Sequence, residues 1–375
     1  MRKDLICLVF LNISLLLING MPLKAQSRVE LKDMVAQMVL VGFRGTVLSP
    51  DSPIIKDIES QKIGGVILYD YDVPSASRPR NIVSANQLKN LVSDLQSHAE
   101  IPLFIAIDQE GGKVNRLKTR YGFPRSVEAA YLGELNNGDS TRYYASLTAE
   151  TLKKSGINVN FAPVLDINVN PECPVIGKLG RSFSYCPDVV INQAAIFYEE
   201  QKAKNILTVN KHFPGHGSSR TDSHKGFTDI TATWSSLELD PYTTLINQHQ
   251  CEAIMTAHVY NANLDSIWPA TLSYAVNTEL LRGKLGFEGL IFSDDMMMGA
   301  IADIYSLKVA IKQSIMAGVD VLVFSNNIKT YDDKIASSAI QCILQLIHEG
   351  EIPESRIRES WQRISESKKM FNLHE

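Results

Sequence analysis

One short segment of the chain gathers several side chains that can carry a proton. Lys211-His212-Phe213-Pro214-Gly215-His216-Gly217 is followed closely by Asp222-Ser223-His224, which places three histidines, a lysine and an aspartate within the 14 residues from 211 to 224. Glycine, proline and serine lie between these groups, so the segment is predicted to be a loop and not the interior of a helix or strand. Such groups on a loop are typical of chemistry on a sugar, a phosphate or a metal ion.

Two adjacent carboxylates, Asp294 and Asp295, follow the apolar run Gly289-Leu290-Ile291-Phe292-Ser293. A carboxylate in that position can act as a nucleophile, a base or a metal ligand. Two alternatives stay open on the residues alone. Asp294 can be a helix cap, a role that Asp295 fills equally well, or it can join other acidic groups or histidines in a metal-dependent hydrolase. No Cys/His spacing typical of a zinc site is present, and we expect neither a metal nor a cofactor.

Eight short apolar runs, rich in β-branched residues, alternate with amphipathic helical patterns. The runs are mostly continuous, as in strands that are buried on both faces of a parallel sheet. The predicted strands are 38–43, 65–69, 103–108, 159–166, 206–212, 253–258, 290–294 and 319–324. The predicted helices are 85–98, 140–154, 187–204, 305–317, 330–348 and a last one from 353. Eight β/α repeats in about 350 residues predict an α/β fold, a single TIM-type (β/α)8 barrel, with a doubly wound open sheet as the alternative.

Charged or titratable groups stand where five of these runs stop. Asp108 ends the third run, Asp166 the fourth, Lys211-His212 the fifth, His258 the sixth and Asp294-Asp295 the seventh. Because the active site of such a barrel forms at the C-terminal ends of the strands, we expect these side chains to surround one site.

The bulk composition is that of a soluble globular protein. The chain has 375 residues, of which 45% are hydrophobic, and a formal net charge of −4. No basic block interleaves with aromatic residues, so we expect no nucleic-acid partner. No linker or shift in composition divides the chain after its first residues, so 26–375 is predicted to be one domain.

The first 25 residues read as a secretory signal. Arg2 and Lys3 precede an apolar run from Leu5 to Ile18, and small residues up to Ala25 follow it. The run is short for a spanning helix, which needs about 20 residues, although an uncleaved anchor is the alternative. We therefore predict a periplasmic or secreted protein without stable membrane insertion after cleavage near Ala25.

Four cysteines remain after that segment. Cys173 and Cys186 flank a short glycine-containing stretch and could form a disulfide in an oxidising compartment, or could remain free thiols. The spacing alone leaves both outcomes open.

Retaining glycoside hydrolysis is one reaction that these residues can perform. It needs a nucleophilic carboxylate, which Asp294 could supply, and an acid/base group about 5 Å away. The second group need not be a carboxylate, because a histidine paired with an aspartate can hold a proton near neutral pH. Asp222 and His224 stand two residues apart and could form such a pair. The alternative is that their loop is only a polar surface turn.

Five motifs in order along the chain resemble those of glycoside hydrolase family 3, in its branch of bacterial β-N-acetylglucosaminidases. The segment from Lys211 to His224 is similar to the signature of that branch. The other similar segments are Ile107-Asp108-Gln109-Glu110-Gly111-Gly112 with Arg116, Asn160-Phe161-Ala162-Pro163-Val164-Leu165-Asp166, Gly180-Arg181-Ser182-Phe183 and Phe292-Ser293-Asp294-Asp295-Met296. The resemblance covers nearly all of the predicted mature chain.

This resemblance implies a role for each motif. Asp294 would be the nucleophile that forms a glycosyl-enzyme intermediate, and His224 would be the general acid/base, oriented by Asp222. The residues that would hold the terminal sugar are Asp108, Arg116, Arg181, Lys211 and His212. The chemistry agrees, because a carboxylate accepts hydrogen bonds from sugar hydroxyls while arginine and lysine donate them. His216 and His258 could contact substrate as well, or could shape the loop and satisfy a strand end.

The implied activity is hydrolysis of terminal non-reducing β-linked N-acetylglucosamine from oligosaccharides such as peptidoglycan or chitin fragments. Many members of the family have a second domain that supplies a glutamate acid/base, and the length of this chain leads us to expect the Asp-His pair instead. A glycoside phosphorylase, a β-glucosidase and a non-catalytic sugar-binding protein are the alternatives. The chain departs from the best-known members at Lys225-Gly226-Phe227-Thr228-Asp229 and at Met296-Met297-Met298, which leaves the aglycone undefined.

Overall fold

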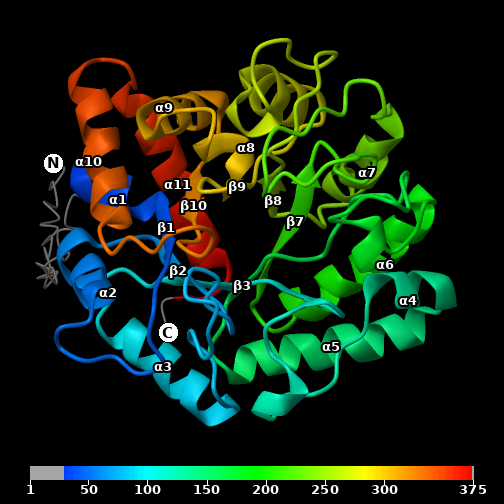
Figure 1. The fold of residues 1–375 in the computed structure, drawn as a ribbon, viewed down its shortest axis with the longest axis horizontal. Helices are drawn as coiled ribbons and strands as arrows, with labels where there is room; N and C mark the ends of the chain where they lie inside the picture. Colours follow the sequence, from blue (N-terminus) through cyan, green and yellow to red (C-terminus); the bar gives the residue numbers. More distant parts are fainter. Residues whose placement is uncertain (1–28, 374–375) are drawn as a thin grey trace, which may run out of the picture. The chain divides into compact units, whose positions relative to one another are not determined.

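The computed structural model describes residues 29–373, in which eight parallel strands close into a barrel surrounded by helices (Figure 1). Around the barrel the strands follow the order β1-β10-β9-β8-β7-β6-β3-β2, and β1 pairs in parallel with both β10 and β2, which closes the ring. The predicted (β/α)8 barrel is therefore confirmed, and the open-sheet alternative is wrong. The barrel strands are β1 (Val39–Gly42), β2 (Gly65–Leu68), β3 (Phe104–Ile107), β6 (Val159–Asn160), β7 (Leu207–Phe213), β8 (Ala253–Thr256), β9 (Leu290–Asp295) and β10 (Val321–Phe324).

Helices connect most of these strands. Side chains cap several of them: Ser84 accepts from the Gln87 amide at the start of α3, and Ser306 accepts from the Val309 amide at the start of α9. The helices are α1 (Leu31–Gln37), α2 (Pro53–Lys56), α3 (Ala85–Ser97), α4 (Ala129–Leu135), α5 (Gly138–Lys154), α6 (Pro187–Lys202), α7 (Asp240–Asn247), α8 (Gly299–Ala302), α9 (Leu307–Ala317), α10 (Ile335–His348) and α11 (Glu354–Met370). A π-helix, Ala275–Lys284, connects β8 to β9, and the sequence patterns did not predict it.

The strand after α5 differs most from its prediction. A strand was expected over 159–166, but β6 ends at Asn160. Pro163 has no N–H to donate to a neighbouring strand, and beyond β6 only an isolated bridge joins Val164 to Lys211. The stretch from Phe161 to Asp166 is therefore mostly irregular, and it carries Asp166 towards the C-terminal end of β7.

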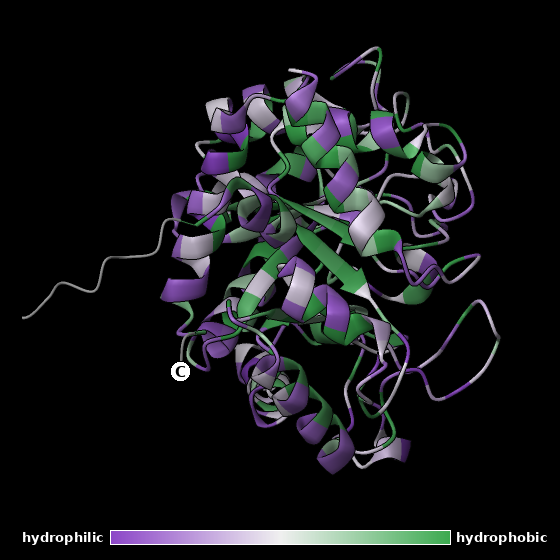
Figure 2. Ribbon diagram, turned by 90° about the vertical axis from the view of Figure 1, so that its left-hand side faces the viewer, coloured by the Kyte–Doolittle hydropathy of each residue, from purple (hydrophilic) through white to green (hydrophobic). Residues whose placement is uncertain are grey.

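Three buried aromatic rings from different sides of the barrel pack against one another. Phe292 of β9 meets Phe104 of β3 and Phe161 edge-to-face, with ring centroids 6.1 Å and 5.7 Å apart. All three rings are buried, and such pairs contribute about 0.5–1.5 kcal/mol each beyond their buried area. Figure 2 shows that the strands inside the barrel are mostly hydrophobic, whereas the surrounding helices also carry hydrophilic residues.

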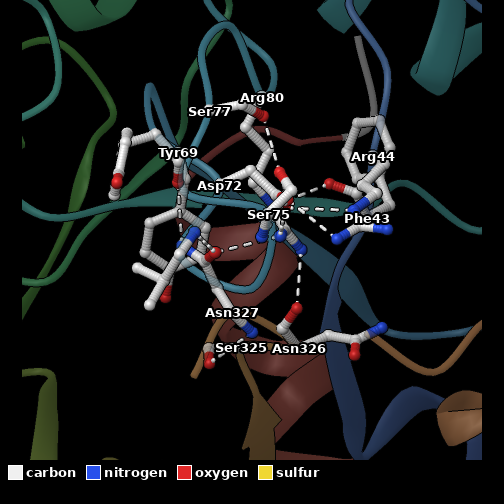
Figure 3. A network of polar contacts seen from close by, with 12 residues as sticks. Phe43, Arg44, Tyr69, Asp72, Ser75, Ser77, Arg80, Ser325, Asn326 and Asn327 are labelled. Atoms are coloured by element: carbon white, nitrogen blue, oxygen red, sulfur yellow. Dashed lines mark hydrogen bonds and ion pairs between the residues drawn. The ribbon is translucent and has the colours of Figure 1, made fainter. Parts of the chain in front are cut away.

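A buried arginine ties together the loops that follow three adjacent strands (Figure 3). Arg80, on the loop after β2, donates from Nε to the Phe43 carbonyl after β1 (3.0 Å) and from NH2 to the Asn326 carbonyl after β10 (2.9 Å). Its remaining nitrogen, NH1, contacts the Asp72 carboxylate and lies 3.0 Å from Asn327 Oδ1. These contacts fix one wall of the C-terminal mouth of the barrel.

Three sequence predictions concern segments away from the barrel. The predicted signal at 1–25 lies outside the described residues. Between residues 29 and 373, none of the helices has the length and apolar character needed to cross a membrane. Cys173 and Cys186 are free thiols in the structure, so the disulfide is not formed; Cys173 Sγ instead lies 3.1 Å from Ser219 Oγ.

Candidate active site

A cavity of about 350 Å³ opens at the C-terminal ends of the strands. It brings together side chains from seven of the eight strands and the segments that follow them, including three of the five strand ends where the sequence places charged or titratable groups. Asp222 does not line it and reaches it only through His224. The predicted site residues that line it are Asp108, Arg116, Arg181, Lys211, His212, His224 and Asp294.

One wall of the cavity is a chain of alternating charges. Lys211 Nζ lies 2.9 Å from Asp108 Oδ1 and 2.7 Å from Glu110 Oε1, so it bridges two carboxylates. Arg181 binds Glu110 with two hydrogen bonds, both of 2.7 Å, and Arg116 NH2 lies 3.2 Å from Asp108 Oδ2. Because every charge has an opposite partner, the array can remain ionised although it is largely buried.

The pKa shifts agree with this arrangement. Burial alone raises the pKa of Asp108, but Lys211 and Arg116 outweigh it and hold that pKa well below its usual range. Burial also raises the pKa of Glu110, but Arg181 and Lys211 outweigh this effect, so the pKa of Glu110 is lowered. At neutral pH the wall therefore offers the Asp108 carboxylate beside the cationic donors Arg116, Arg181 and Lys211, which is the complement that sugar hydroxyls require, while Glu110 does not itself line the cavity.

Glu110 supports the site through Lys211 and Arg181 without lining the cavity, and we did not predict a role for it from the sequence. It lies two residues after Asp108, in the short hairpin strand β4 (Gln109–Gly111) that pairs with β5 (Val114–Asn115). Alternation along an extended segment places residues i and i+2 on one face, and this signal could have identified Glu110 from the position of Asp108.

His212 is held by Asp166, which the sequence predicted at a strand end facing the site but without a specific role. The His212 amide and Nδ1 both contact the Asp166 carboxylate, at 3.2 Å and 2.6 Å, and that carboxylate is fully buried. Nδ1 therefore donates to Asp166, which leaves Nε2 to accept from Arg181 NH2 at 3.3 Å. Burial raises the pKa of Asp166, but His212 outweighs that effect and lowers it.

His216 shapes the loop and does not line the cavity. Its amide donates to Asp166 Oδ1 (2.8 Å), and its two ring nitrogens lie 2.8 Å from Ser219 Oγ and 3.0 Å from Ser223 Oγ. Burial, followed by the nearby His212, lowers the pKa of His216 to about 4, so its ring is neutral. The residue joins the sugar-facing end of the loop to the segment that carries His224.

The segment 222–224 presents a histidine–aspartate pair at the mouth. His224 Nδ1 lies 2.9 Å from Asp222 Oδ1, so Nε2 is the ring nitrogen left for a substrate. Desolvation lowers the pKa of His224, but Asp222 and Asp294 outweigh it and raise that pKa above its usual value. The His224 carbonyl accepts from the Gly299 amide (3.2 Å), which anchors the pair against the start of α8.

Asp294 occupies the end of β9 and faces the same cavity. Burial raises its pKa, but His258, His212 and His224 outweigh that effect, so the pKa is lowered and the carboxylate is ionised at neutral pH. Asp295 turns towards β10, where Oδ1 accepts from the Ser325 amide at 2.9 Å. Burial raises the pKa of Asp295 to about 6.

The helix-cap alternative for the two aspartates is wrong, because the N-cap residue of α8 is Met298. His258 is a satisfied strand-end histidine: Nδ1 lies 2.8 Å from Thr271 Oγ1, and Nε2 donates to the Asp295 carbonyl at 2.9 Å. Among the described residues, no three His, Cys, Asp or Glu side chains are grouped so as to hold a metal ion.

A (β/α)8 barrel with an aspartate, an aspartate–histidine pair and a wall of paired charges around one cavity has a fold and groups that glycoside hydrolysis can use. The chain belongs to glycoside hydrolase family 3: residues 30–366 match the family model described as glycosyl hydrolase family 3 N terminal domain.

Several known proteins resemble the chain over most of its length. It is 32% identical over 344 residues to beta-hexosaminidase A of Pseudoalteromonas piscicida, covering 86% of this chain and 56% of that protein. It is 37% identical over 270 residues to a beta-hexosaminidase of Tolumonas auensis, covering 71% and 76%. The solved family 3 beta-N-acetylglucosaminidase from Paenibacillus sp. str. FPU-7 superposes with a TM-score of 0.84 at 31% identity, covering 93% of this chain and 64% of that one. The chain thus spans only 56% and 64% of the lengths of the Pseudoalteromonas and Paenibacillus proteins.

Proposed function

We propose that this protein is a retaining exo-β-N-acetylglucosaminidase that removes terminal non-reducing β-linked N-acetylglucosamine from oligosaccharides. The observation that carries the proposal is that Asp294 and His224, which is paired with Asp222, line the same cavity. Asp294 raises the pKa of His224, and His224 helps to lower the pKa of Asp294. Asp294 favours the protonated imidazole, and the imidazole favours the ionised carboxylate, so both groups start in the states that the first step needs.

In the first step an Asp294 oxygen attacks the anomeric carbon as the bond from that carbon to the leaving oxygen breaks. The proton on His224 Nε2 passes to the leaving oxygen, so the aglycone departs as a neutral alcohol and the sugar remains esterified to Asp294. Asp222 stabilises the imidazolium before transfer and keeps Nδ1 protonated afterwards.

In the second step the neutral His224 Nε2 takes a proton from water as the water oxygen attacks the anomeric carbon. The ester bond breaks, Asp294 regains its charge and the sugar leaves with its original anomeric configuration. Both steps use the same two groups, and the pKa of His224, raised above its usual value, suits a group that must give and take a proton.

The wall of paired charges formed by Asp108, Glu110, Arg116, Arg181 and Lys211, called the charge wall below, would hold the hydrolysed sugar. Asp108 and Glu110 have their charges fixed by Lys211 and Arg181, so the wall is formed before substrate arrives and costs little reorganisation when it binds. The names of the relatives support N-acetylglucosamine as the sugar. Peptidoglycan or chitin fragments are the substrates that we propose, together with export guided by the N-terminal segment.

The test is hydrolysis of a chromogenic β-N-acetylglucosaminide beside the matching β-glucoside, each with and without inorganic phosphate. We expect release of free N-acetylglucosamine at a rate that phosphate does not change. Accumulation of the sugar 1-phosphate would assign a phosphorylase instead, and a clear preference for the glucoside would contradict the proposed substrate.

A further inference from the structure

A group of cations surrounds one buried carboxylate at the edge of the cavity. The Asp70 carboxylate, whose side chain is 1% exposed, lies 2.7 Å from Lys118 Nζ and 3.0 Å from Arg120 NH2, and it also contacts Arg78. All three cations meet the same oxygen, Oδ2. We call Arg78, Lys118 and Arg120 around Asp70 the rim cluster.

The rim cluster has more positive charge than its carboxylate neutralises. Three cations face one anion, which leaves an excess of two positive charges. Burial lowers the pKa of Lys118, and although Asp70 raises it, Arg78 and Arg120 lower it further. Such mutual repulsion is relieved when a second anion binds beside the first.

Aromatic rings hold the two arginines in place without neutralising them. Arg78 lies over the Tyr71 ring at 4.9 Å, and Arg120 lies over the Tyr121 ring at 4.8 Å. Both guanidinium side chains remain accessible, with 36% and 50% of their surface exposed. Their charged ends are therefore positioned in advance, which reduces the entropy lost when they bind a ligand.

The rim cluster adjoins the sugar cavity. Asp70 and Tyr71 line that cavity, and so does Arg116, which binds Asp108. Arg116 Nε is buried and has no hydrogen-bond acceptor within the described part of the chain. An unsatisfied buried donor between the rim cluster and the charge wall is a further place for an acceptor atom of the ligand.

The topology of the barrel decides which part of a substrate reaches this place. The rim cluster comes from the segments that follow β2 and β5, next to the end of β3, whereas Asp294 ends β9. β3 and β9 are four positions apart in both directions around the barrel and so lie opposite each other. A sugar with its anomeric carbon at Asp294 would therefore point its remote hydroxyls towards Asp108, and substituents on those hydroxyls towards the rim cluster.

We propose that the rim cluster binds an anionic substituent, a carboxylate or a phosphate, carried by the hydrolysed sugar at a position remote from its anomeric carbon. This inference rests on the proposed function and extends the accepted sugar from N-acetylglucosamine to its derivatives that carry an acidic group, which would be the preferred substrates. A phosphate ester on the sugar and a carboxylate ether share this chemistry, and matched substrates distinguish them.

The experiment compares kcat/KM for three aryl β-glycosides: the neutral N-acetylglucosaminide, its 3-O-lactyl ether and its 6-phosphate. The proteins are the wild type, the double variant Arg78→Gln/Arg120→Gln and the control Arg142→Gln, which removes an exposed arginine paired with Glu199 and Glu200 on the outer helices. Hydrogen bonds to charged groups are the stronger ones, and losing two of them lowers kcat/KM by about tenfold or more.

We expect at least one acidic substrate to exceed the neutral one with the wild type and to lose that advantage in the double variant. The neutral substrate should be cleaved equally by all three proteins, which also shows that the double variant folds. Concentrated salt should reduce only the advantage of the acidic substrate. A wild type that cleaves the neutral substrate but neither acidic one, or a double variant with an unchanged ratio, would overturn the inference. If no protein cleaves any of the three substrates, the proposed function itself fails.

Discussion

Asp222 accepts two hydrogen bonds from His224 on one oxygen, Oδ1: one from the backbone amide at 3.0 Å and one from ring Nδ1 at 2.9 Å. The two bonds fix both the position and the tautomer of a histidine whose side chain is 56% exposed. A half-exposed ring would otherwise rotate freely. The two bonds to Asp222 therefore orient the His224 ring while it remains accessible to a substrate.

Replacing Asp222 by Asn should keep a hydrogen-bond partner for Nδ1 but remove the charge that raises the pKa of His224. The alkaline limb of the kcat/KM profile should therefore move to lower pH, and kcat should fall by about 10- to 100-fold. The measurement is the pH dependence of aryl glycoside hydrolysis. Asp229→Asn, on the same loop, is the control; an alkaline limb at the wild-type pH in Asp222→Asn would contradict the assignment.

The wild-type pH profile should be bell-shaped. Asp294 must be ionised, and because its pKa is lowered, activity should persist into acid until that carboxylate is protonated. His224 must be protonated, and because its pKa is raised, activity should fall only above the usual range of histidine. Initial rates at low substrate concentration report both limbs, and an alkaline limb below the usual histidine pKa would argue against His224.

Replacing Glu110 by Gln should weaken sugar binding, because Lys211 and Arg181 then lose their shared carboxylate. We expect kcat/KM to fall by about 100-fold, with most of the loss in KM and with little change in the positions of the pH limbs. Glu134→Gln, at an exposed position on α4, is the matched control. Wild-type KM in Glu110→Gln would show that the charge wall does not hold the sugar.

His216 should make folding stability depend on pH. Its pKa is about 4 when folded and about 6.5 when unfolded, so only the unfolded chain binds this proton between those values. The stability that its neutral ring supports is complete above about pH 6.5 and is lost as pH falls towards 4, by about 3 kcal/mol in total. Urea unfolding at pH 7 and pH 5 should show a smaller difference for His216→Gln than for the wild type; equal differences would refute the claim.

Lys368 should also make folding stability depend on pH, but at higher pH than His216. Its ammonium is buried against Gln37 Oε1 (2.6 Å) and the Gly64 carbonyl (3.1 Å), and burial lowers its pKa to about 7. Between pH 7 and about 10.5 only the unfolded chain holds the proton, so this contribution to stability grows as pH rises. Lys368→Met should be more stable than the wild type relative to the exposed control Lys369→Met, and its advantage in Tm should shrink from pH 7 to pH 9.5. A constant advantage would contradict the linkage.

The barrel could be predicted because its strands are short and buried on both faces, so they are mostly continuous apolar runs, five of which stop at a charged or titratable residue. The exception, 159–166, shows the limit of this signal: the run is equally apolar, but Pro163 cannot donate to a neighbouring strand, and β6 ends early. The connection from β8 to β9, which contains the π-helix Ala275–Lys284, was not predicted from the sequence, and neither was the helix α7 that precedes β8.

The candidate site could be predicted where its residues stand at strand ends or in recognisable motifs. Glu110 and Asp166 lie in motifs that were recognised in the sequence, but no role was predicted for them. Their roles depend on the cation or histidine that each one contacts in the folded chain, and the order of residues does not specify that contact. The Arg80 network and the rim cluster lie on long loops without periodic patterns, where only the folded chain brings Asp70 to Lys118.

In the proposed mechanism Asp294 forms a covalent bond to the sugar, and this bond can be trapped. The wild type is incubated with a 5-fluoro-N-acetylglucosaminyl fluoride, which forms the intermediate faster than water removes it, and the digested protein is analysed by mass spectrometry. We expect one sugar adduct, on the peptide that contains Asp294, and none with Asp294→Asn. An adduct on another carboxylate, or product NMR that shows inversion at the anomeric carbon, would contradict this mechanism.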